Sequence, residues 1–455
     1  MSASEVAEDP AATDIETPRP VAPVKGNFTR ELVSVTAGRM IAKICQFLIG
    51  VVAARLIGPD GRGLIASFAV APDLAVSFSQ LGIREAVAYH IGRKTYDAGE
   101  IVPTLLGMAF TANLVAISAC VAYYAATGLL NQPWILVVLA LGPVPFMLLT
   151  SYAGGVFLGK MMIARFNRVN WIPMALNLVL VLVFGLVLKI GVAGIMLAAV
   201  VAAALNCAYG YYLLRSVTPL RIGFNREIAS KLTRLGVVYA TTVFMMLLNY
   251  RLPILLLHNL SSLEQVGIYA VAQTLALMIW EIPEVLSNLV FSRGVNAENK
   301  AAFSDKVVVL ARLVVLAGVG VGIGCAIVGP IAIPLIFGEK FRESATILTI
   351  LLPGTVAFMA FRVLNMDMAG RGHPWISIPV VVPCMAANAG LGLFFVPEYG
   401  APAAATLTSA SYILATLAYV VVYARFTRQP LRSILIYRAS DFAAVLYRLR
   451  HLRHK

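Results

Sequence analysis

Long apolar segments recur along the whole chain and are separated by short hydrophilic joints. Each segment has about 20 residues or more, the length that an α-helix needs to cross the hydrocarbon core of a bilayer. The segments lie at residues 33–57, 63–91, 100–127, 133–158, 168–188, 192–214, 234–257, 266–291, 306–336, 343–369, 375–396 and 401–425. This pattern predicts an all-α integral membrane protein with twelve transmembrane helices.

The second half of the chain repeats short sequence features of the first half. Three pairs of segments match, at offsets of 204, 211 and 209 residues: Gly63-Leu64-Ile65-Ala66 with Gly267-Ile268-Tyr269-Ala270, Leu158-Gly159-Lys160 with Ala369-Gly370-Arg371, and Gly191-Val192-Ala193 with Gly400-Ala401-Pro402. At the offset of 211, Asn177 also matches Asn388. The repeat indicates two copies of one helical bundle.

The two copies define the expected domain organisation. Residues 25–215 are predicted to form an N-terminal six-helix bundle and residues 232–426 a C-terminal one, joined by a basic cytoplasmic linker at residues 216–231. Because each bundle has an even number of spans, both run the same way through the membrane. The pseudo-two-fold axis then lies along the membrane normal, and transporters built in this way bind substrate between the halves.

Composition and charge agree with a membrane protein. The chain is 60% hydrophobic and 13% charged, whereas soluble domains carry about 25% charged residues. Most of the lysines and arginines behind the net charge of +14 lie in alternate joints and in the C-terminal tail, and the joints of the other side carry only Arg62, Lys189, Lys340 and Arg342. This distribution is typical of membrane topology and does not indicate a nucleic-acid partner, and the positive-inside rule places both termini in the cytoplasm.

The two tails have different compositions. Residues 1–24 combine acidic residues and prolines without apolar runs, which predicts a disordered acidic tail. Residues 427–455 place leucines and other apolar residues on one broad helical side and arginines elsewhere. We expect a basic amphipathic tail on the anionic inner leaflet; the alternative is a solvated basic end.

The first predicted span carries two cations inside an apolar run. Arg39, Lys43 and Gln46 stand at i, i+4 and i+7, so they share one helical face. A cation at the centre of a membrane helix costs about 2.5–3.5 kcal/mol on insertion scales, and such residues usually face a bundle interior or a wet cavity. Two neighbouring cations without an acid on their own helix suit an anionic group such as a phosphate or diphosphate.

Further polar faces lie on other spans. The remaining candidate substrate-binding residues are Asp73, Ser77, Gln80 and Arg84 in one continuous stripe on the second span, Arg251 on the seventh, Glu281, Glu284 and Asn288 on the eighth, and Arg362 on the tenth. Glu281 and Glu284 are expected to bind a coupling cation or proton, or else to neutralise Arg39 and Lys43 across the bundle. For all these groups the alternative is a structural ion pair or snorkelling to the headgroups.

No catalytic motif is present in the sequence. We find no Walker loop, no H-E-x-x-H and no G-x-S-x-G, and the five cysteines each sit inside an apolar run without C-x-x-C spacing. The sequence therefore predicts neither an enzyme nor a cofactor or metal site.

Two stretches resemble bacterial polysaccharide flippases of the multidrug/oligosaccharidyl-lipid/polysaccharide exporter superfamily. One is GR-x-I-x-K-x-x-QF at residues 38–47, followed by AARLIGPDGRGLIASF at residues 53–68. The other is NAGLGLFFVPEYGAPAAATLTS at residues 388–409, which is similar to the Asn, Pro-x-x-Gly, small-residue segment of that family. The resemblance extends over all twelve spans.

The resemblance implies a function. Such a protein would flip an undecaprenyl-diphosphate-linked oligosaccharide across the bacterial cytoplasmic (inner) membrane by alternating access, for exopolysaccharide or O-antigen assembly. Arg39 and Lys43 would correspond to the cationic central cavity of the family. The implied partners are the lipid-linked glycan, membrane lipids, a polysaccharide polymerase and glycosyltransferases.

Departures from two other branches of the superfamily narrow the expectation. Peptidoglycan-precursor flippases typically have fourteen spans, and drug exporters typically have acidic cavity residues in the N-terminal half. Here Asp73 is the one intramembrane acid before Glu85. Two alternatives stay open: a cation-coupled multidrug antiporter, and a non-transporting membrane scaffold for glycosyltransferases.

Overall fold

The computed structural model describes residues 28–80, 82–281, 283–284, 286–287, 290 and 300–436. The expected acidic tail at residues 1–24, the candidate residue Asn288 and the end of the chain after residue 436 lie outside this part. The described α-helices are α1 (Phe28–Ser79), α2 (Ile83–Gly92), α3 (Ala98–Ala126), α4 (Trp134–Leu141), α5 (Pro143–Gly159), α6 (Ile163–Val181), α7 (Val192–Arg215), α8 (Arg226–Leu260), α9 (Leu263–Met278), α11 (Lys300–Phe337), α12 (Glu343–Gly370), α13 (Ile378–Thr427) and α14 (Leu431–Leu435). The expected all-helical fold class is confirmed for this part of the chain.

Eight helical stretches of the described residues are long and apolar enough to cross a membrane. Two of them are unusually long, because α1 has 52 residues and α13 has 50. Each of these two helices contains one residue with non-helical backbone: Gly58 has φ 67° and Gly400 has φ 56°. A positive φ is readily available to glycine, so these residues allow α1 and α13 each to change direction. The protein is a multi-pass membrane protein.

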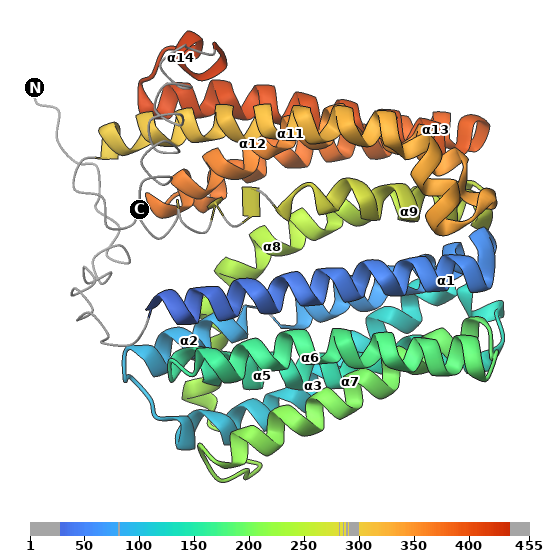
Figure 1. The fold of residues 1–455 in the computed structure, drawn as a ribbon. Coiled ribbons are helices and arrows are strands. Elements are labelled where there is room, and N and C mark those ends of the chain that lie inside the picture. Colours follow the sequence, from blue (N-terminus) through green and yellow to red (C-terminus); the bar gives the residue numbers. More distant parts are fainter. Residues whose placement is uncertain are drawn as a thin grey trace, which may run out of the picture.

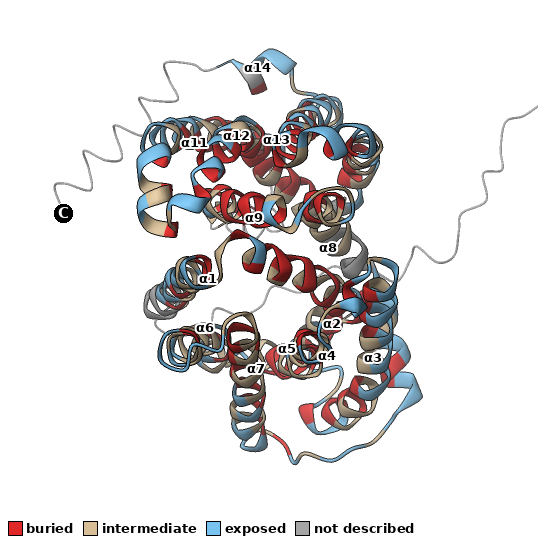
Figure 2. Ribbon diagram, turned by 90° about the vertical axis from the view of Figure 1, so that its right-hand side faces the viewer, coloured by how far each residue is buried: buried red, intermediate tan, exposed pale blue. Residues whose placement is uncertain are grey.

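The helices form two groups that lie side by side (Figure 1). One group contains α1 to α7 and the other contains most of α8 together with α9 to α14, and each has its own hydrophobic core. The start of α8 packs on the first group through Ile228 and Leu232. Figure 2 shows buried residues concentrated inside each group and along α1 and α9, where the groups meet.

Two glycines from the matching segments of the repeat form a close backbone contact between the groups. A Cβ atom on Gly63 of α1 would overlap the carbonyl oxygen of Leu263, and one on Gly267 of α9 would overlap the carbonyl oxygen of Pro59. A Cβ atom on either glycine would also lie 3.0 Å from the backbone nitrogen of the other glycine. The contact is therefore reciprocal, as expected for residues related by a two-fold axis, and a larger side chain cannot occupy either position without separating the helices.

Polar contacts also tie α8 to the loop between α2 and α3. Lys231 donates hydrogen bonds to Glu227 at 2.7 Å and to the hydroxyl of Tyr96 at 2.8 Å. Asp97 of the same loop accepts a hydrogen bond of 2.5 Å from Lys160, which follows the end of α5. This hydrogen bond lowers the pKa of the Asp97 carboxyl. These contacts hold the charged ends of α3, α5 and α8 in register.

Candidate functional site

The two cations of the first span face an acid of the second helix group. Lys43 Nζ lies 2.9 Å from Glu281 Oε1, and an Arg39 guanidinium nitrogen lies 3.5 Å from Glu281 Oε2. The two cationic side chains are 38% and 40% exposed and the acid is 27% exposed, so the protein does not fully enclose any of the three. One carboxylate balances one of the two positive charges. This cluster therefore keeps a net charge of +1 at the boundary between the groups.

A second ion pair crosses the same boundary. Asp73 of α1 accepts a hydrogen bond from Arg251 of α8, and both side chains are 28% exposed. Both residues were candidates from the sequence, and the structure brings them together. Arg251 lies nine residues before the end of α8, so it sits about 14 Å inside that helix.

Two further charged candidates, Arg362 and Glu284, form a separate pair within the second group. Arg362 donates to Glu284, and also to the hydroxyl of Tyr250 at 3.2 Å. Its guanidinium carbon lies 5.1 Å from the ring centre of Trp280, a cation–π distance. The expectation that acids of the eighth span neutralise Arg39 and Lys43 is therefore met in the geometry by Glu281, while Glu284 has another partner. Tyr250 and Trp280 were not singled out from the sequence, because an aromatic residue is an ordinary core residue until its cationic neighbour is known.

The predicted continuous stripe on the second span is wrong. Helix α1 ends at Ser79 and α2 begins at Ile83, and Gly82 between them has φ 60°, a left-handed conformation that interrupts the helix. Gln80 and Arg84 consequently face a cavity inside the first group, while Asp73 faces α8. A helical projection of the sequence assumes an unbroken helix and cannot anticipate this turn. Arg84 is paired with the neighbouring Glu85 at 2.8 Å.

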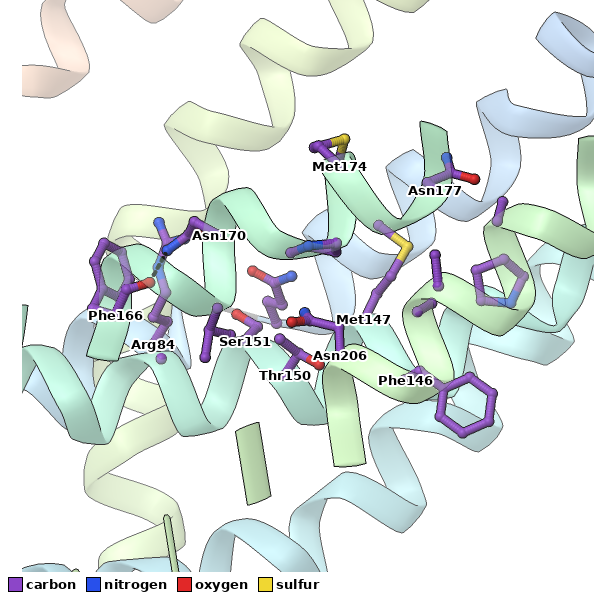
Figure 3. A pocket seen from close by; sticks show the side chains of 18 residues that line it. Arg84, Phe146, Met147, Thr150, Ser151, Phe166, Asn170, Met174, Asn177 and Asn206 are labelled. Carbon is purple, nitrogen blue, oxygen red and sulfur yellow. Dashed lines mark hydrogen bonds between the residues drawn. The ribbon is translucent and has the colours of Figure 1, made fainter. Parts of the chain in front are cut away.

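The cavity inside the first group has a volume of about 340 Å³ and is lined by α5, α6 and α7 as well as by residues 80 and 84 (Figure 3). Its polar lining consists of Gln80, Arg84, Thr150, Ser151, Asn170, Asn177 and Asn206. Four of these side chains have a buried oxygen without a hydrogen-bond partner in the described structure: Thr150, Ser151, Asn177 and Asn206. Buried polar groups need such partners, so the cavity suits ordered water or a ligand rich in hydroxyl groups.

Sequence reasoning found Gln80 and Arg84 but missed the other polar residues of this cavity. They come from three helices, and single Asn, Ser and Thr residues in apolar spans are too common to stand out. One signal was available, because Asn177 matches Asn388 in the repeat.

An apolar groove lies next to the cationic cluster. It has a volume of about 480 Å³ and runs between Phe47 of α1 and side chains of α9, α11 and α12, among them Leu275, Met278, Val328 and Ile336. Phe47 follows Lys43 by one helical turn. A ligand held by Lys43 could therefore place an apolar tail in this groove.

The described residues contain no group of three or more His, Cys, Asp or Glu side chains that could hold a metal ion. The cysteines are all unbridged.

These features define a class: polytopic membrane proteins with two helical halves and a charged boundary between them. The fold is similar to a lipid II flippase MurJ in an inward closed conformation, with a TM-score of 0.69, 12% identity, and 89% of each chain covered. It is also similar to a multidrug resistance MATE family transporter of the MOP superfamily in its inward-facing conformation, with a TM-score of 0.69, 15% identity, and 89% of this chain and 100% of that chain covered. An outward-facing structure of such a MATE transporter gives a TM-score of 0.57, with 15% identity and coverage of 90% and 97%.

The sequence itself identifies the family. Residues 52–346, more than half of the chain, match the polysaccharide biosynthesis protein family, and the chain belongs to that family. No curated protein sequence gives a significant match. The expected link to polysaccharide biosynthesis is therefore confirmed by the family, and the fold is similar to those of the lipid II flippase and the MATE transporters.

Proposed function

We propose that this protein is a flippase that moves an undecaprenyl-diphosphate-linked oligosaccharide from the inner to the outer leaflet of the bacterial cytoplasmic membrane, for exopolysaccharide or O-antigen assembly. The observation that carries the proposal is the cluster of Arg39, Lys43 and Glu281, which keeps one uncompensated positive charge at the boundary between the helix groups. Family membership supports a role in polysaccharide biosynthesis. Structural similarity to a lipid II flippase supports lipid-linked cargo.

The proposal includes twelve spans arranged as two six-helix bundles, with both termini in the cytoplasm. The breaks at Gly58 and Gly400 support this count, because each divides one long helix into two segments of membrane-spanning length. The start of α1 lies at the same end of the molecule as α14, as an even number of passes requires (Figure 1). The reciprocal contact of Gly63 and Gly267 then lies near the outer face.

The proposed mechanism assigns each part of the lipid-linked sugar to one region. Arg39 and Lys43 bind the diphosphate and release Glu281, the polar cavity of the first bundle hydrates the sugars, and the apolar groove beside Phe47 takes the start of the lipid tail. The bundles then rock, which separates Gly63 from Gly267. An inside-negative membrane potential favours the outward movement of each negative charge by about 2.3 kcal/mol per 100 mV.

The lipid-linked oligosaccharide pool tests the proposal in a bacterial strain that lacks this protein. We expect the intermediate to accumulate on the inner leaflet, to clear with the wild type, and to persist with the Arg39→Ala/Lys43→Ala variant. Two charge-assisted contacts of about 1.5–3 kcal/mol each are lost, so affinity falls about a hundredfold or more. A Lys340→Ala/Arg342→Ala variant, which removes two exposed cations elsewhere, serves as the matched control. Normal surface glycan without accumulation in the deletion strain contradicts the proposal.

A second candidate is a cation-coupled multidrug antiporter, which the MATE-like fold and the two acids Glu281 and Glu284 favour. In that case the acids are indispensable and the cations are not. A scaffold for glycosyltransferases, in contrast, tolerates loss of both Arg39 and Lys43.

A further inference from the structure

Arg62 is a cation that the charge pattern assigns to an outer joint but that the structure places inside the protein. It lies in the first turn after Gly58, within α1. Its Nε atom is buried and has no hydrogen-bond partner, and the guanidinium forms no ion pair with any residue that the structure describes. One terminal nitrogen instead lies over Gly50, 3.9 Å from where a Cβ atom of that glycine would be.

Gly50 continues the cationic face of the first span. Arg39, Lys43, Gln46 and Gly50 stand at i, i+4, i+7 and i+11 on one side of α1. Eleven residues of helix cover about 16 Å, so the Arg62 guanidinium lies about that far along the same face from Arg39. Because glycine has no side chain, there is room for the Arg62 guanidinium over Gly50.

Arg62 is close to the ion pair that crosses the boundary between the groups. Gly50, over which the Arg62 guanidinium lies, is eight residues or about 12 Å inside the break at Gly58. Arg251 lies at a similar depth, about 14 Å inside the end of α8, and it is itself bound to Asp73. Arg62 and Arg251 together with Asp73 make two cations and one acid. Arg39 and Lys43 with Glu281 have the same composition at the other end of the face.

The residue that follows Arg62 closes the boundary at this end. Gly63 packs against the backbone of Leu263 and Gly267, so the contact between the groups begins directly beside Arg62. Separation of Gly63 from Gly267 would uncover the guanidinium. A half-buried cation that forms no ion pair with the described residues is, at such a position, ready to receive an anion when the closure opens.

Resting on the function proposed above, we propose that Arg62 and Arg251 form a second anion site at the outer end of the passage. This site binds the diphosphate after the bundles have rocked and before the lipid leaves. Arg39 and Lys43 capture the anion, and Arg62 receives it. The Arg251–Asp73 ion pair separates when the anion binds, as the contacts of Glu281 with Arg39 and Lys43 do at the first site.

The test uses the full-length protein in liposomes that contain undecaprenyl diphosphate labelled with ³²P in its terminal phosphate. An externally added phosphatase releases label only from lipid that has reached the outer leaflet. Binding of farnesyl diphosphate to the purified protein is measured separately. The variants are Arg62→Gln and Arg62→Lys, with Arg342→Gln as an exposed control.

We expect Arg62→Gln to slow label release at least about tenfold and to leave farnesyl diphosphate binding within about twofold. The melting temperature should rise slightly, because a half-buried cation that pairs with no described acid is removed. Arg62→Lys keeps the charge and should retain most of the rate, and Arg342→Gln should match the wild type. A structural role for Arg62 predicts the opposite change in melting temperature.

Four results overturn the proposal. If Arg62→Gln releases label at the wild-type rate, Arg62 is not part of an anion site. The same holds if folded Arg62→Gln and Arg62→Lys are equally defective. Both results contradict the second anion site but leave the proposed function intact. Should the wild type neither bind farnesyl diphosphate nor move the labelled lipid, the proposed function itself is wrong. A lower melting temperature for Arg62→Gln makes Arg62 a structural residue.

Discussion

The two helix groups share a repeated sequence pattern but have different interiors. In the second group, aromatic rings fill the centre: the ring centroids of Phe358 and Phe361 are 4.5 Å apart, and those of Phe358 and Tyr412 are 4.7 Å apart. Each of the three side chains is at most 4% exposed. In the first group the centre is a polar cavity of about 340 Å³.

The repeat shows that these two regions correspond. At the offset of 211 residues, Met147 and Thr150 of the cavity match Phe358 and Phe361, and at the offset of 209 Ala203 matches Tyr412. The polar residues correspond as well, because Ser151 matches Arg362 and Gln80 matches Glu284. The ion pair and aromatic stack of one half thus take the place of uncharged, non-aromatic residues in the other.

The different interiors of the two groups suit them to different roles in transport. A close-packed aromatic core resists deformation, so we expect the second group to stay rigid in the proposed transport cycle. The first group keeps space and unsatisfied polar atoms, which are the properties needed to hold water or sugar hydroxyls. The two halves share repeated sequence features, but a few different central residues leave one close-packed and the other hollow.

The largest effect should come from filling the first group with the aromatic residues of the second. The variant Met147→Phe/Thr150→Phe/Ala203→Tyr is expected to reduce lipid translocation to the level of empty liposomes, because the rings occupy the cavity. The strain of added core volume is typically about 1–3 kcal/mol, so the protein should still fold. Phosphatase-coupled translocation and thermal melting in detergent measure the two effects.

The control for this variant adds a ring to the outside of the same helix. The control variant is Leu205→Phe. Leu205 lies on α7 close to Ala203, but it is 50% exposed and faces away from the cavity. The control variant should translocate lipid like the wild type. Wild-type transport by the filled, folded triple variant would show that the cavity has no role in transport.

The next effect concerns stability. Phe361→Ala should lower the free energy of unfolding by about 3–5 kcal/mol, because it leaves a cavity in a close-packed core. The corresponding Thr150→Ala should change it by less than about 1 kcal/mol, since the hydroxyl that it removes has no partner in the described structure. Unfolding in detergent with increasing denaturant compares the two; equal losses would mean that both interiors are packed alike.

The sequence predicted the fold well because membrane helices follow simple physical rules. Apolar length placed the spans, and repeated glycine motifs such as those at Gly63 and Gly267 predicted two related halves, which the reciprocal contact between them supports. The turn at Gly82 was missed, because a left-handed glycine in a long apolar run leaves no trace in hydrophobic periodicity. Arg62 was assigned to a joint for a related reason: its position in the chain is close to Gly58, but its side chain points inward.

The candidate site was predicted in its residues but not in its pairing. Helical spacing correctly put Arg39 and Lys43 on one face, since that depends on a single helix. Which acid faces which cation depends on how separate helices pack, and the sequence left this open for Glu281 and Glu284. The structure assigns Glu281 to the first span and Glu284 to Arg362 of its own group. Spacing within a helix is local information, whereas contacts between helices are not.

The smallest effect tests this pairing and separates the two candidate functions. Glu281→Gln removes the acid that competes for Arg39 and Lys43, and a partly exposed pair is worth about 0.5–1 kcal/mol, so farnesyl diphosphate should bind about two- to fivefold more tightly. Glu284→Gln, the matched control, should leave binding within about twofold, because Glu284 pairs with Arg362 inside the second group. Titration of the purified variants measures both affinities. A flippase that uses the cations keeps translocating lipid in both variants, whereas an antiporter that uses the acids loses cation-coupled drug transport in both. Loss of lipid translocation in Glu281→Gln, despite intact binding, would mean that this acid takes part in the transport cycle and does more than balance charge.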